Sequence, residues 1–341
     1  MSGVERRALL LGFGGAAVLI AGLLWLVDVG QVTDVVLRAD PLLLTAMLGL
    51  AVLWLAAWGE TLRTVLASMD VDVRARTAFF VYAAAVFANN VTPFGQAGGE
   101  PVTALLVSKV SGKRYETGLV SIASVDVLNA LSSVALVFLG LGVYASRYTL
   151  GTSVTAAAGT IVALVVTIVT VFTFAWRFRE RLVDRLAAPI ASVINRLRRG
   201  PFAADSAVTA AGVAERLRHF VGNVEAVAGD RRRLLQALSL STAGWLLQSA
   251  ALIVAFSALG YTLPVAVSLF VIPLANLAGM APLPGGLGGI EAAFVALLVP
   301  TTGIPAAAVT AAVLLFRVAI YWMPVVLGGS TASFYGAMEL Y

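Results

Sequence analysis

Two short segments of this chain share a pattern of proline, glycine and glutamate that breaks one helix and places a carboxylate at the start of the next. Residues 93–100 read P-x-G-x-x-G-x-E, and so do residues 284–291, which lie 191 positions further on. The same offset relates Asp126 to Arg317. Proline lacks an N–H, and glycine adopts backbone conformations that are closed to other residues. Interrupted helices that occur twice in a hydrophobic chain predict the substrate site of a transporter.

The chemistry available at these breaks is recognition of a charged headgroup. Free N–H groups at a helix start attract negative charge, so two half-helices that begin near Glu100 and Glu291 could cradle a phosphate. The sequence leaves open whether these glutamates cap their own helices, bind a proton or balance a cation. Arg317 stands within an apolar stretch and needs a partner; the candidates are Glu100, Asp126 and Glu291. We expect its guanidinium to bind a lipid phosphate while it shares a carboxylate, with a purely structural ion pair as the alternative.

The candidate site consists of the polar, charged and glycine positions in and beside the two motifs. The predicted substrate-binding residues are Asn89, Asn90, Gly98, Gly99, Glu100, Asp126, Gly286, Gly289, Glu291 and Arg317. The predicted helix-breaking residues are Pro93, Gly95, Pro282 and Pro284.

The sequence predicts neither catalytic residues nor a metal site. It has no cysteine, and its single histidine, His219, stands in a polar loop and receives no role. Catalytic motifs such as G-x-S-x-G and H-E-x-x-H are missing, so we predict that the protein is not an enzyme. A P-loop is missing as well. We therefore expect no cofactor, and transport that is either passive or coupled to an ion.

The composition places the chain in the membrane class. Hydrophobic residues make up 60% of it and charged residues 12%, and its mean hydropathy is +0.94. Stretches of about 20 apolar residues are long enough to cross a bilayer as helices. Six such spans are predicted, at about 8–27, 41–67, 117–145, 152–176, 234–259 and 305–335. The first of these resembles a signal peptide, but we expect it to be a retained helix.

Two further apolar regions, 77–110 and 265–300, contain the motifs. Each is predicted to be a pair of half-helices that enters and leaves the membrane on the same side. With this arrangement, 20 of the 23 Lys and Arg residues fall on one side, which predicts a plasma-membrane protein with both termini in the cytoplasm.

The predicted fold is therefore an all-α polytopic membrane protein with about six transmembrane helices plus two re-entrant half-helix hairpins arranged as an inverted repeat. It forms a single membrane domain, 1–341. Repeat one covers about 41–145 and repeat two about 234–335, in opposite orientations. Inverted repeats of this kind support alternating access.

The long loop between the repeats, about 177–233, is basic and cytoplasmic in this prediction. Apolar residues recur in it at helical spacing, at Leu182, Leu186, Ile190, Val193 and Leu197. A basic amphipathic helix of this kind contacts an anionic leaflet, either as a plain connector or as a collar that gathers anionic headgroups. The net charge of +5 follows from this positional bias, so no nucleic-acid partner and no oligomeric state are predicted.

At its motifs the chain resembles the flippase-like membrane family named for the transmembrane region of lysylphosphatidylglycerol synthases. The resemblance extends from about residue 40 to 335. It rests on N-x-x-x-P-x-G-x-x-G-G-E-P at 89–101, P-x-P-G-G-L-G-G-x-E-A-A at 282–293 and R-x-x-x-Y-x-x-P-x-x-x-G-G at 317–329. It implies a membrane domain with re-entrant helices that moves phospholipid or polyprenyl-linked lipid between leaflets. Thr103 and Ile290 stand where many relatives carry arginine, so the site is less basic, and we expect no soluble aminoacyl-transferase domain.

These observations favour a lipid translocase that passes the headgroup of a phospholipid or polyprenyl-phosphate-linked lipid through a polar cavity at the midplane. Asn90, Glu100, Glu291 and Arg317 would contact the headgroup, and Asp126 would tune its charge. The partner is then a membrane lipid. One alternative is a small-solute or ion-coupled secondary transporter on the same scaffold. Another is a membrane partner of a lipid-modifying enzyme.

Overall fold

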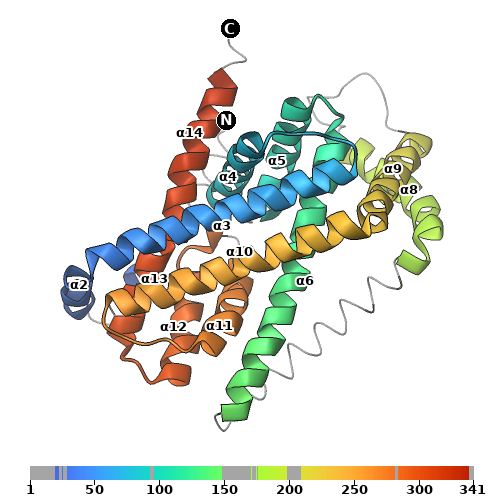
Figure 1. Ribbon diagram of the computed structural model, residues 1–341. Coiled ribbons are helices and arrows are strands. Elements are labelled where there is room, and N and C mark those ends of the chain that lie inside the picture. The colour runs from blue at the N-terminus through green and yellow to red at the C-terminus, as the bar shows by residue number, and fades with distance from the viewer. Residues whose placement is uncertain are drawn as a thin grey trace. The chain divides into compact units, whose positions relative to one another are not determined.

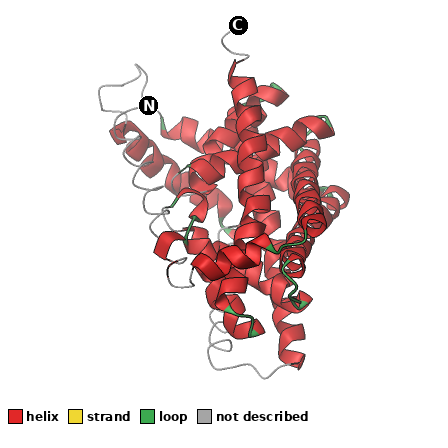
Figure 2. Cartoon of the chain, turned by 90° about the vertical axis from the view of Figure 1, so that its left-hand side faces the viewer, coloured by secondary structure: helices red, strands yellow, loops and turns green. Residues whose placement is uncertain are grey.

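The structure is a computed structural model, and it describes residues 20–22, 25, 29–92, 96–147, 170, 174, 176–197, 209–280 and 283–337. The described residues form helices and no strands, as predicted (Figures 1 and 2). The chain divides into two compact units. The larger unit comprises Met1–Thr149 and Arg232–Tyr341, and the smaller one comprises Leu150–Arg231.

Long apolar helices of the larger unit form where the sequence predicts spans. Three of them are α3 (Pro41–Ser68), α6 (Tyr115–Arg147) and α10 (Arg231–Ala258). The fourth is a continuous run made of α13 (Ala306–Arg317), the π-helical segment η3 (Val318–Trp322) and α14 (Met323–Ala337). The predicted spans 41–67, 117–145, 234–259 and 305–335 are thereby confirmed as helices.

Five helices in the described part are long and apolar enough to cross a membrane: Pro41–Ser68, Tyr115–Ser146, Arg231–Ala258, Pro284–Thr302 and Ala306–Thr331. The protein is therefore a polytopic all-α membrane protein, as predicted. The predicted spans 8–27 and 152–176 lie almost wholly outside the described residues.

Helix α3 begins and ends for identifiable reasons. Asp40 precedes it, and its Oδ1 accepts the N–H groups of Leu42 and Leu43, which have no partner within the helix. Pro41 occupies the first helical position, where a missing N–H costs nothing. The chain leaves the helix at Met69, and Asp70 adopts a left-handed backbone with φ of +54°.

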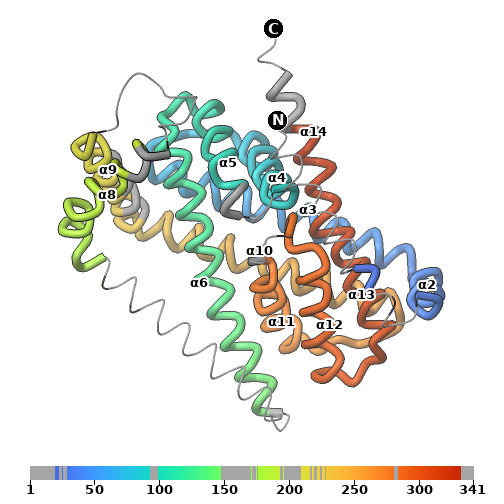
Figure 3. The backbone as a smooth tube through the Cα atoms, turned by 180° about the vertical axis from the view of Figure 1, so that it is seen from behind, coloured from blue at the N-terminus to red at the C-terminus, as the bar shows by residue number. Residues whose placement is uncertain are grey.

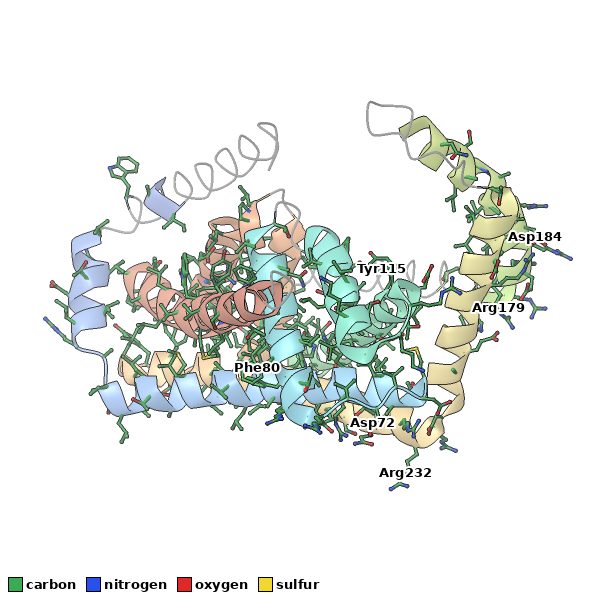
Figure 4. All side chains as sticks on the ribbon, turned by 90° about the horizontal axis from the view of Figure 1, so that it is seen from above. Asp72, Phe80, Tyr115, Arg179, Asp184 and Arg232 are labelled. Atoms are coloured by element: carbon green, nitrogen blue, oxygen red, sulfur yellow. The ribbon has the colours of Figure 1, made fainter. Side chains whose placement is uncertain are left out.

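Helices α3 and α10 run antiparallel, side by side (Figure 1). The N–H of Asp40 donates to the carbonyl of Ala258 at one end, and Arg233 donates to the carbonyl of Ala67 at the other. Figure 4 shows Asp72 and Arg232 together at this second end. The two helices therefore run in opposite directions and contact each other near both ends.

Glycine allows α3 and α10 to touch midway. A Cβ at Gly244 would overlap the indole of Trp58, whose Nε1 donates to the carbonyl of Ser241 at 3.1 Å. The ring of Trp245 packs edge-on against Trp58 at 5.3 Å. The contact is thus a small residue facing a large aromatic one, with the indole N–H satisfied.

Each motif lies between two short helices that pack against each other. Helices α4 (Ala75–Val91) and α5 (Gln96–Ser111) flank the first break, and α11 (Val265–Leu277) and α12 (Gly289–Thr302) flank the second (Figure 3). At 1.5 Å per residue these helices are about 20 to 26 Å long. Both predicted interruptions are confirmed as breaks between helices.

The 191-residue offset between the motifs extends to the bounds of the helices. Adding it to 41–68 gives 232–259, and α10 occupies 231–258. Adding it to 115–147 gives 306–338, and the run from α13 to α14 occupies 306–337. Both halves of the larger unit thus have the same order of long helix, broken pair and long helix.

One helix of the larger unit lies outside the predicted elements. Helix α2 (Val29–Leu37) precedes α3, and its Val32 packs against Ala307 and Ala311 of α13. Alanines at these positions of α13 leave room for the additional helix.

The smaller unit contains a pair of helices, α8 (Arg179–Leu197) and α9 (Ala210–Gly229). Val183, Ala187 and Ala191 of α8 face Val213 and Ala214 of α9. Two ion pairs join the helices, Arg179 with Glu225 at 2.7 Å and Arg218 with Asp184 at 2.8 Å; Figure 4 labels Arg179 and Asp184.

The predicted amphipathic stripe of α8 therefore differs from the face that packs. A helix is confirmed in this region. Of the predicted row, Ile190 packs against the cluster between α8 and α9, whereas Leu186 is 46% exposed, and the buried row begins at Val183. The sequence contains two overlapping apolar rows, and small residues in the row at 183, 187 and 191 let α9 approach. Val193 and His219 have no described side chain.

Candidate substrate site at the two helix breaks

The second break is a tight turn that only glycine tolerates. Pro284–Gly286 forms one 3₁₀ turn, and Gly285, Gly286 and Gly288 have φ of +54°, +65° and +84°. A Cβ at Gly286 would lie 2.7 Å from the backbone of Gly279. Pro284, which is predicted to break the helix, begins this turn, and Gly286, which is predicted to bind substrate, ends it, whereas Pro282 lies outside the described residues.

Glu291 occupies the first turn of α12 and performs two tasks at once. Its Oε2 accepts the N–H of Gly288 at 2.6 Å, which caps the helix. Its Oε1 accepts Nε of Arg317 at 2.6 Å. The side chain is almost completely buried, with 1% of the residue exposed. Capping and pairing with a cation, which the sequence presents as alternatives, are thus combined in one carboxylate.

Arg317 ends α13 and points into the second break. Beside its bond to Glu291, its Nη2 donates to the carbonyl of Gly285 at 3.1 Å. Its guanidinium carbon lies 4.7 Å from the ring centroid of Tyr321, in cation–π geometry. Of the three carboxylates that the sequence offers as partners, the structure places Glu291 against Arg317. The arginine is 7% exposed, so the ion pair is closed off from its surroundings.

The first break has a different electrostatic character. The carboxyl groups of Glu100, on α5, and Asp126, on α6, lie within hydrogen-bonding reach of each other. Two carboxyl groups can share a hydrogen bond only when one of them carries a proton. Among the described residues no cation pairs with either group. The first break therefore holds an acid pair where the second holds an ion pair.

A buried polar network continues from Asp126 along α6. Asn129 lies one turn further on, and its Oδ1 accepts the hydroxyl of Ser241 at 2.7 Å. The side chain of Tyr82 also hydrogen-bonds to Asn129 and faces Asp126. Nε1 of Trp245 donates to the carbonyl of Asn129 at 2.9 Å. These bonds link α4, α6 and α10 around the acid pair.

Close packing at the first break depends on glycine as well. A Cβ at Gly99 would overlap the side chain and backbone of Asn89. The Oδ1 of Asn89 is buried there and has no hydrogen-bond partner among the described residues. Gly98 lies in the first turn of α5. Gly289 begins α12, where a Cβ would meet only ordinary contacts. Pro93 and Gly95 lie outside the described residues.

The two breaks touch each other through Asn90 and Tyr321. The Tyr321 hydroxyl donates to the carbonyl of Asn90 at 3.0 Å, and Nδ2 of Asn90 donates to the carbonyl of Tyr321 at 3.4 Å. Gly285 fits between them, because a Cβ on it would overlap the Tyr321 ring and lie 3.0 Å from the Asn90 carbonyl. The end of α4 is thereby held against the second break.

These contacts reproduce the sequence offset in space. Glu100 and Glu291 are 191 residues apart, and so are Asp126 and Arg317. The structure places Glu100 beside Asp126 and Glu291 beside Arg317. In one half the glutamate meets an acid; in the other it meets a guanidinium.

Several residues of the site were not among the predicted ones: Tyr82, Asn129, Ser241, Gly285 and Tyr321. Tyr321 stands in the third motif, four residues after Arg317, and that spacing was the available signal. No signal in the sequence marks Ser241, because the packing of α10 against α6 fixes its position.

Comparison with known proteins agrees with the motifs. The family model described as the lysylphosphatidylglycerol synthase TM region matches residues 10–328. A UPF0104 membrane protein of Methanothermobacter thermautotrophicus is 25% identical over 345 residues, covering 98% of this chain and 96% of that protein. A UPF0104 membrane protein of Pyrococcus horikoshii is 24% identical over 95% of this chain and 96% of its own length. The glycosyltransferase AglD of Haloferax volcanii is 41% identical over 124 residues, 34% of this chain and 19% of that protein.

Proposed function

This chain belongs to the lysylphosphatidylglycerol synthase transmembrane-region family, and from that membership together with its site we propose that it is a lipid translocase. It moves the headgroup of a phospholipid or polyprenyl-phosphate-linked lipid between leaflets while the acyl or prenyl tails stay in the bilayer. The observation that carries the proposal is the buried Arg317–Glu291 pair in a helix break of a polytopic membrane protein.

The cost of burying these charges supports a functional role. Ionisable groups within a membrane protein are expensive and mark substrate or ion pathways. Arg317 already has a carboxylate, a carbonyl and an aromatic face around it, and its planar fork retains N–H groups suited to a phosphate. A headgroup phosphate would compete with Gly285 and Glu291 for the guanidinium. The site would then act as a transient anion site rather than as a permanent one.

An inverted repeat explains how such a site could serve both leaflets. The helix bounds recur at the 191-residue offset, and the equivalent helices α3 and α10 run antiparallel, as inverted halves would. The short helices α4, α5, α11 and α12 fall below the roughly 30 Å of the hydrocarbon core, which favours re-entrant hairpins. Exchange of the conformations of the two halves would expose Arg317 to each leaflet in turn.

The orientation proposed for this arrangement has both termini in the cytoplasm of a plasma-membrane protein, because the arginine-rich unit then lies inside. The α8–α9 pair would rest on the anionic leaflet with its basic residues. A membrane lipid is the partner, and no reaction is catalysed on it. Transport is passive or coupled to an ion, and the proton shared by Glu100 and Asp126 is the available coupling site.

One observation favours a second candidate. The match to a protein named as a glycosyltransferase is the strongest in identity among the relatives described above, 41% over 124 residues. A membrane subunit that serves a lipid-modifying enzyme would share this segment without moving lipid by itself. A small-solute or ion-coupled transporter on the same scaffold is the remaining alternative.

Reconstitution into vesicles tests the proposal. The purified protein is incorporated with a fluorescent phospholipid or a polyprenyl-phosphate sugar, and the fraction of label accessible from outside is followed in time. We expect the parent to move lipid and Arg317→Ala, Glu291→Gln and Glu100→Gln to slow it at least tenfold. The matched control is Arg63→Ala, which removes an arginine paired with Glu60 on α3, away from both breaks.

The outcomes separate the candidates. Lipid movement that is equal in the parent and all three site variants contradicts the assignment of the site. A parent that moves no lipid but takes up a soluble ion or solute supports the secondary transporter. A parent that is inactive alone and stimulates a lipid-modifying enzyme supports the partner subunit.

A further inference from the structure

Tyr321 connects Arg317 of the second break to Asn90, at the end of α4 beside the first break. Its ring faces the Arg317 guanidinium, its hydroxyl donates to the Asn90 carbonyl, and its own carbonyl accepts the Asn90 amide. The residue is 2% exposed. Asn90 belongs to α4, whereas Tyr321 follows Arg317 on the same helical run, so the two bonds to Asn90 exist only while the end of α4 stays against the second break.

The backbone at Tyr321 is itself unusual. Residues Val318–Trp322 form a π-helical segment, and the N–H of Met323 donates to the carbonyl of Val318, five residues back. Such segments are rare, and those within α-helices occur frequently at functional sites. Here the segment begins directly after Arg317. It separates α13, which carries the guanidinium, from α14, which packs against α4.

We propose that Tyr321 is the gate residue of the site: its contacts with Asn90 keep the two breaks closed over Arg317, and they must part before a headgroup reaches the guanidinium. The proposal deepens the translocase function and rests on it. Tyr321 acts as a positioning residue, because it holds Arg317 and the Asn90 segment in place and need not touch the lipid.

Two features of the contact make it a gate rather than ordinary packing. Gly285 lies between the Tyr321 ring and Asn90 with no space for a side chain, so the three segments can separate only by moving as wholes. In addition, the carbonyl of Gly285 accepts a hydrogen bond from Nη2 of Arg317. Withdrawal of the Gly285 segment therefore releases Nη2 from this carbonyl at the same time. The π-helical segment supplies the place where α14 can shift along or around its axis without moving α13.

Removal of the Tyr321 hydroxyl tests the gate directly. Tyr321→Phe keeps the ring over Arg317 and deletes only the bond to Asn90. One such bond changes an equilibrium by about two- to tenfold, so we expect lipid movement in vesicles to become about fivefold faster. Asn90→Ala, which deletes the reciprocal bond, is expected to act in the same direction.

The matched control is Tyr144→Phe. The hydroxyl of Tyr144 on α6 donates to the carbonyl of Thr301 at 3.1 Å, so this variant removes the same atom and the same kind of bond away from the breaks. We expect its rate to equal that of the parent. Where the parent moves lipid, a Tyr321→Phe rate equal to or below that of the parent overturns the gate.

Hydrogen–deuterium exchange provides a readout that does not depend on lipid movement. We expect amides of residues 283–291 to exchange about fivefold faster in Tyr321→Phe than in the parent, and to be unchanged in Tyr144→Phe. Faster exchange in a protein that moves no lipid under any condition supports the gate and contradicts the translocase function. Unchanged exchange in both Tyr321→Phe and Asn90→Ala overturns the gate, whatever the transport activity.

Discussion

The two glutamates of the repeated motif show how one sequence pattern acquires two electrostatic roles. Glu291 meets Arg317, and the pair is buried together with the cap of α12. Glu100 meets Asp126, and the pair requires a proton to be stable in the same kind of position. The residue 26 positions after each glutamate decides which role it takes.

This difference predicts effects of different size on stability for the same Glu→Gln substitution. Glu291→Gln keeps the acceptor for the Gly288 N–H but leaves Arg317 buried without a counter-charge, so we expect a loss of about 3 kcal/mol in the free energy of unfolding. Glu100→Gln replaces one carboxyl group of a pair that already shares a proton by a neutral amide that can still form a hydrogen bond, so we expect a change within about 1 kcal/mol. Thermal unfolding of the detergent-purified variants measures both. Equal losses would show that the two carboxylates are electrostatically alike and would contradict the acid pair.

At this scale the sequence predicts the breaks and the charged residues but not their pairing. Arg317 has three candidate partners in the sequence, and only the packing of α12 against α13 selects Glu291. Tyr321 was missed because an aromatic residue in an apolar helix is indistinguishable from a packing residue until its hydroxyl has a partner. Asn129 and Ser241 are similarly ordinary in the sequence, and their bond depends on a contact between helices 112 residues apart.

At the scale of elements, close contacts between helix backbones position the site. The third motif ends in Gly328 and Gly329, and both lie on α14 where it packs against Ala83 and Phe87 of α4. Small residues let two helices of a membrane protein approach closely, which is their main means of association in lipid. The glycines thus hold α14 against the helix whose end carries Asn90.

The two neighbouring glycines should respond differently to the same added methyl group. In Gly328→Ala the Cβ would overlap the carbonyl oxygen of Ala83 and lie 2.7 Å from Cβ of Phe87, so we expect α14 to be displaced and about 2 kcal/mol of stability to be lost. In Gly329→Ala the nearest atom is Cε2 of Phe87 at 3.2 Å, which is the far end of a side chain. The gain in helix propensity of up to about 1 kcal/mol then offsets the contact.

Thermal unfolding of the two variants, with Gly142→Ala as a control in open space, measures the difference. Comparable losses for Gly328→Ala and Gly329→Ala would indicate that α14 does not pack on α4 in this register.

The long helices of the described part could be predicted from the sequence, because an apolar run of 20 or more residues can cross a bilayer only as a helix or within a closed barrel. The bounds of α3, α6 and α10 fall within a few residues of the predicted spans. Helix α2 was not predicted, because its nine residues are too few for a transmembrane span. The π-helical segment was not predicted, because its hydrogen-bond register depends on packing rather than on any residue type. Helix α8 was predicted as a lone amphipathic helix because α9 shows a weaker apolar row.

At the scale of the whole molecule, the repeat predicts which connections share a side of the membrane. If α4 and α5 form a re-entrant pair, the connection before α4 and the connection after α5 lie on the same side, although a pair of helices separates them. The same holds for α11 and α12 on the opposite side. Pro284–Thr302 is one of the five segments that are long and apolar enough to cross a membrane. It begins, however, with the 3₁₀ turn of the break, and its continuous helix of 14 residues is only about 21 Å long.

Single cysteines can test this topology cleanly, because the chain has none of its own. Asp72→Cys and Lys113→Cys flank α4 and α5, whereas Thr262→Cys and Pro305→Cys flank α11 and α12; all four positions are exposed. In cells treated with a membrane-impermeant maleimide, we expect Thr262→Cys and Pro305→Cys to react. Asp72→Cys and Lys113→Cys should react only after the membrane is opened, because the basic side faces the cytoplasm. Opposite accessibility within either pair would mean that the intervening helices cross the bilayer, and the two glutamates would then lie on continuous transmembrane paths instead of at the tips of hairpins.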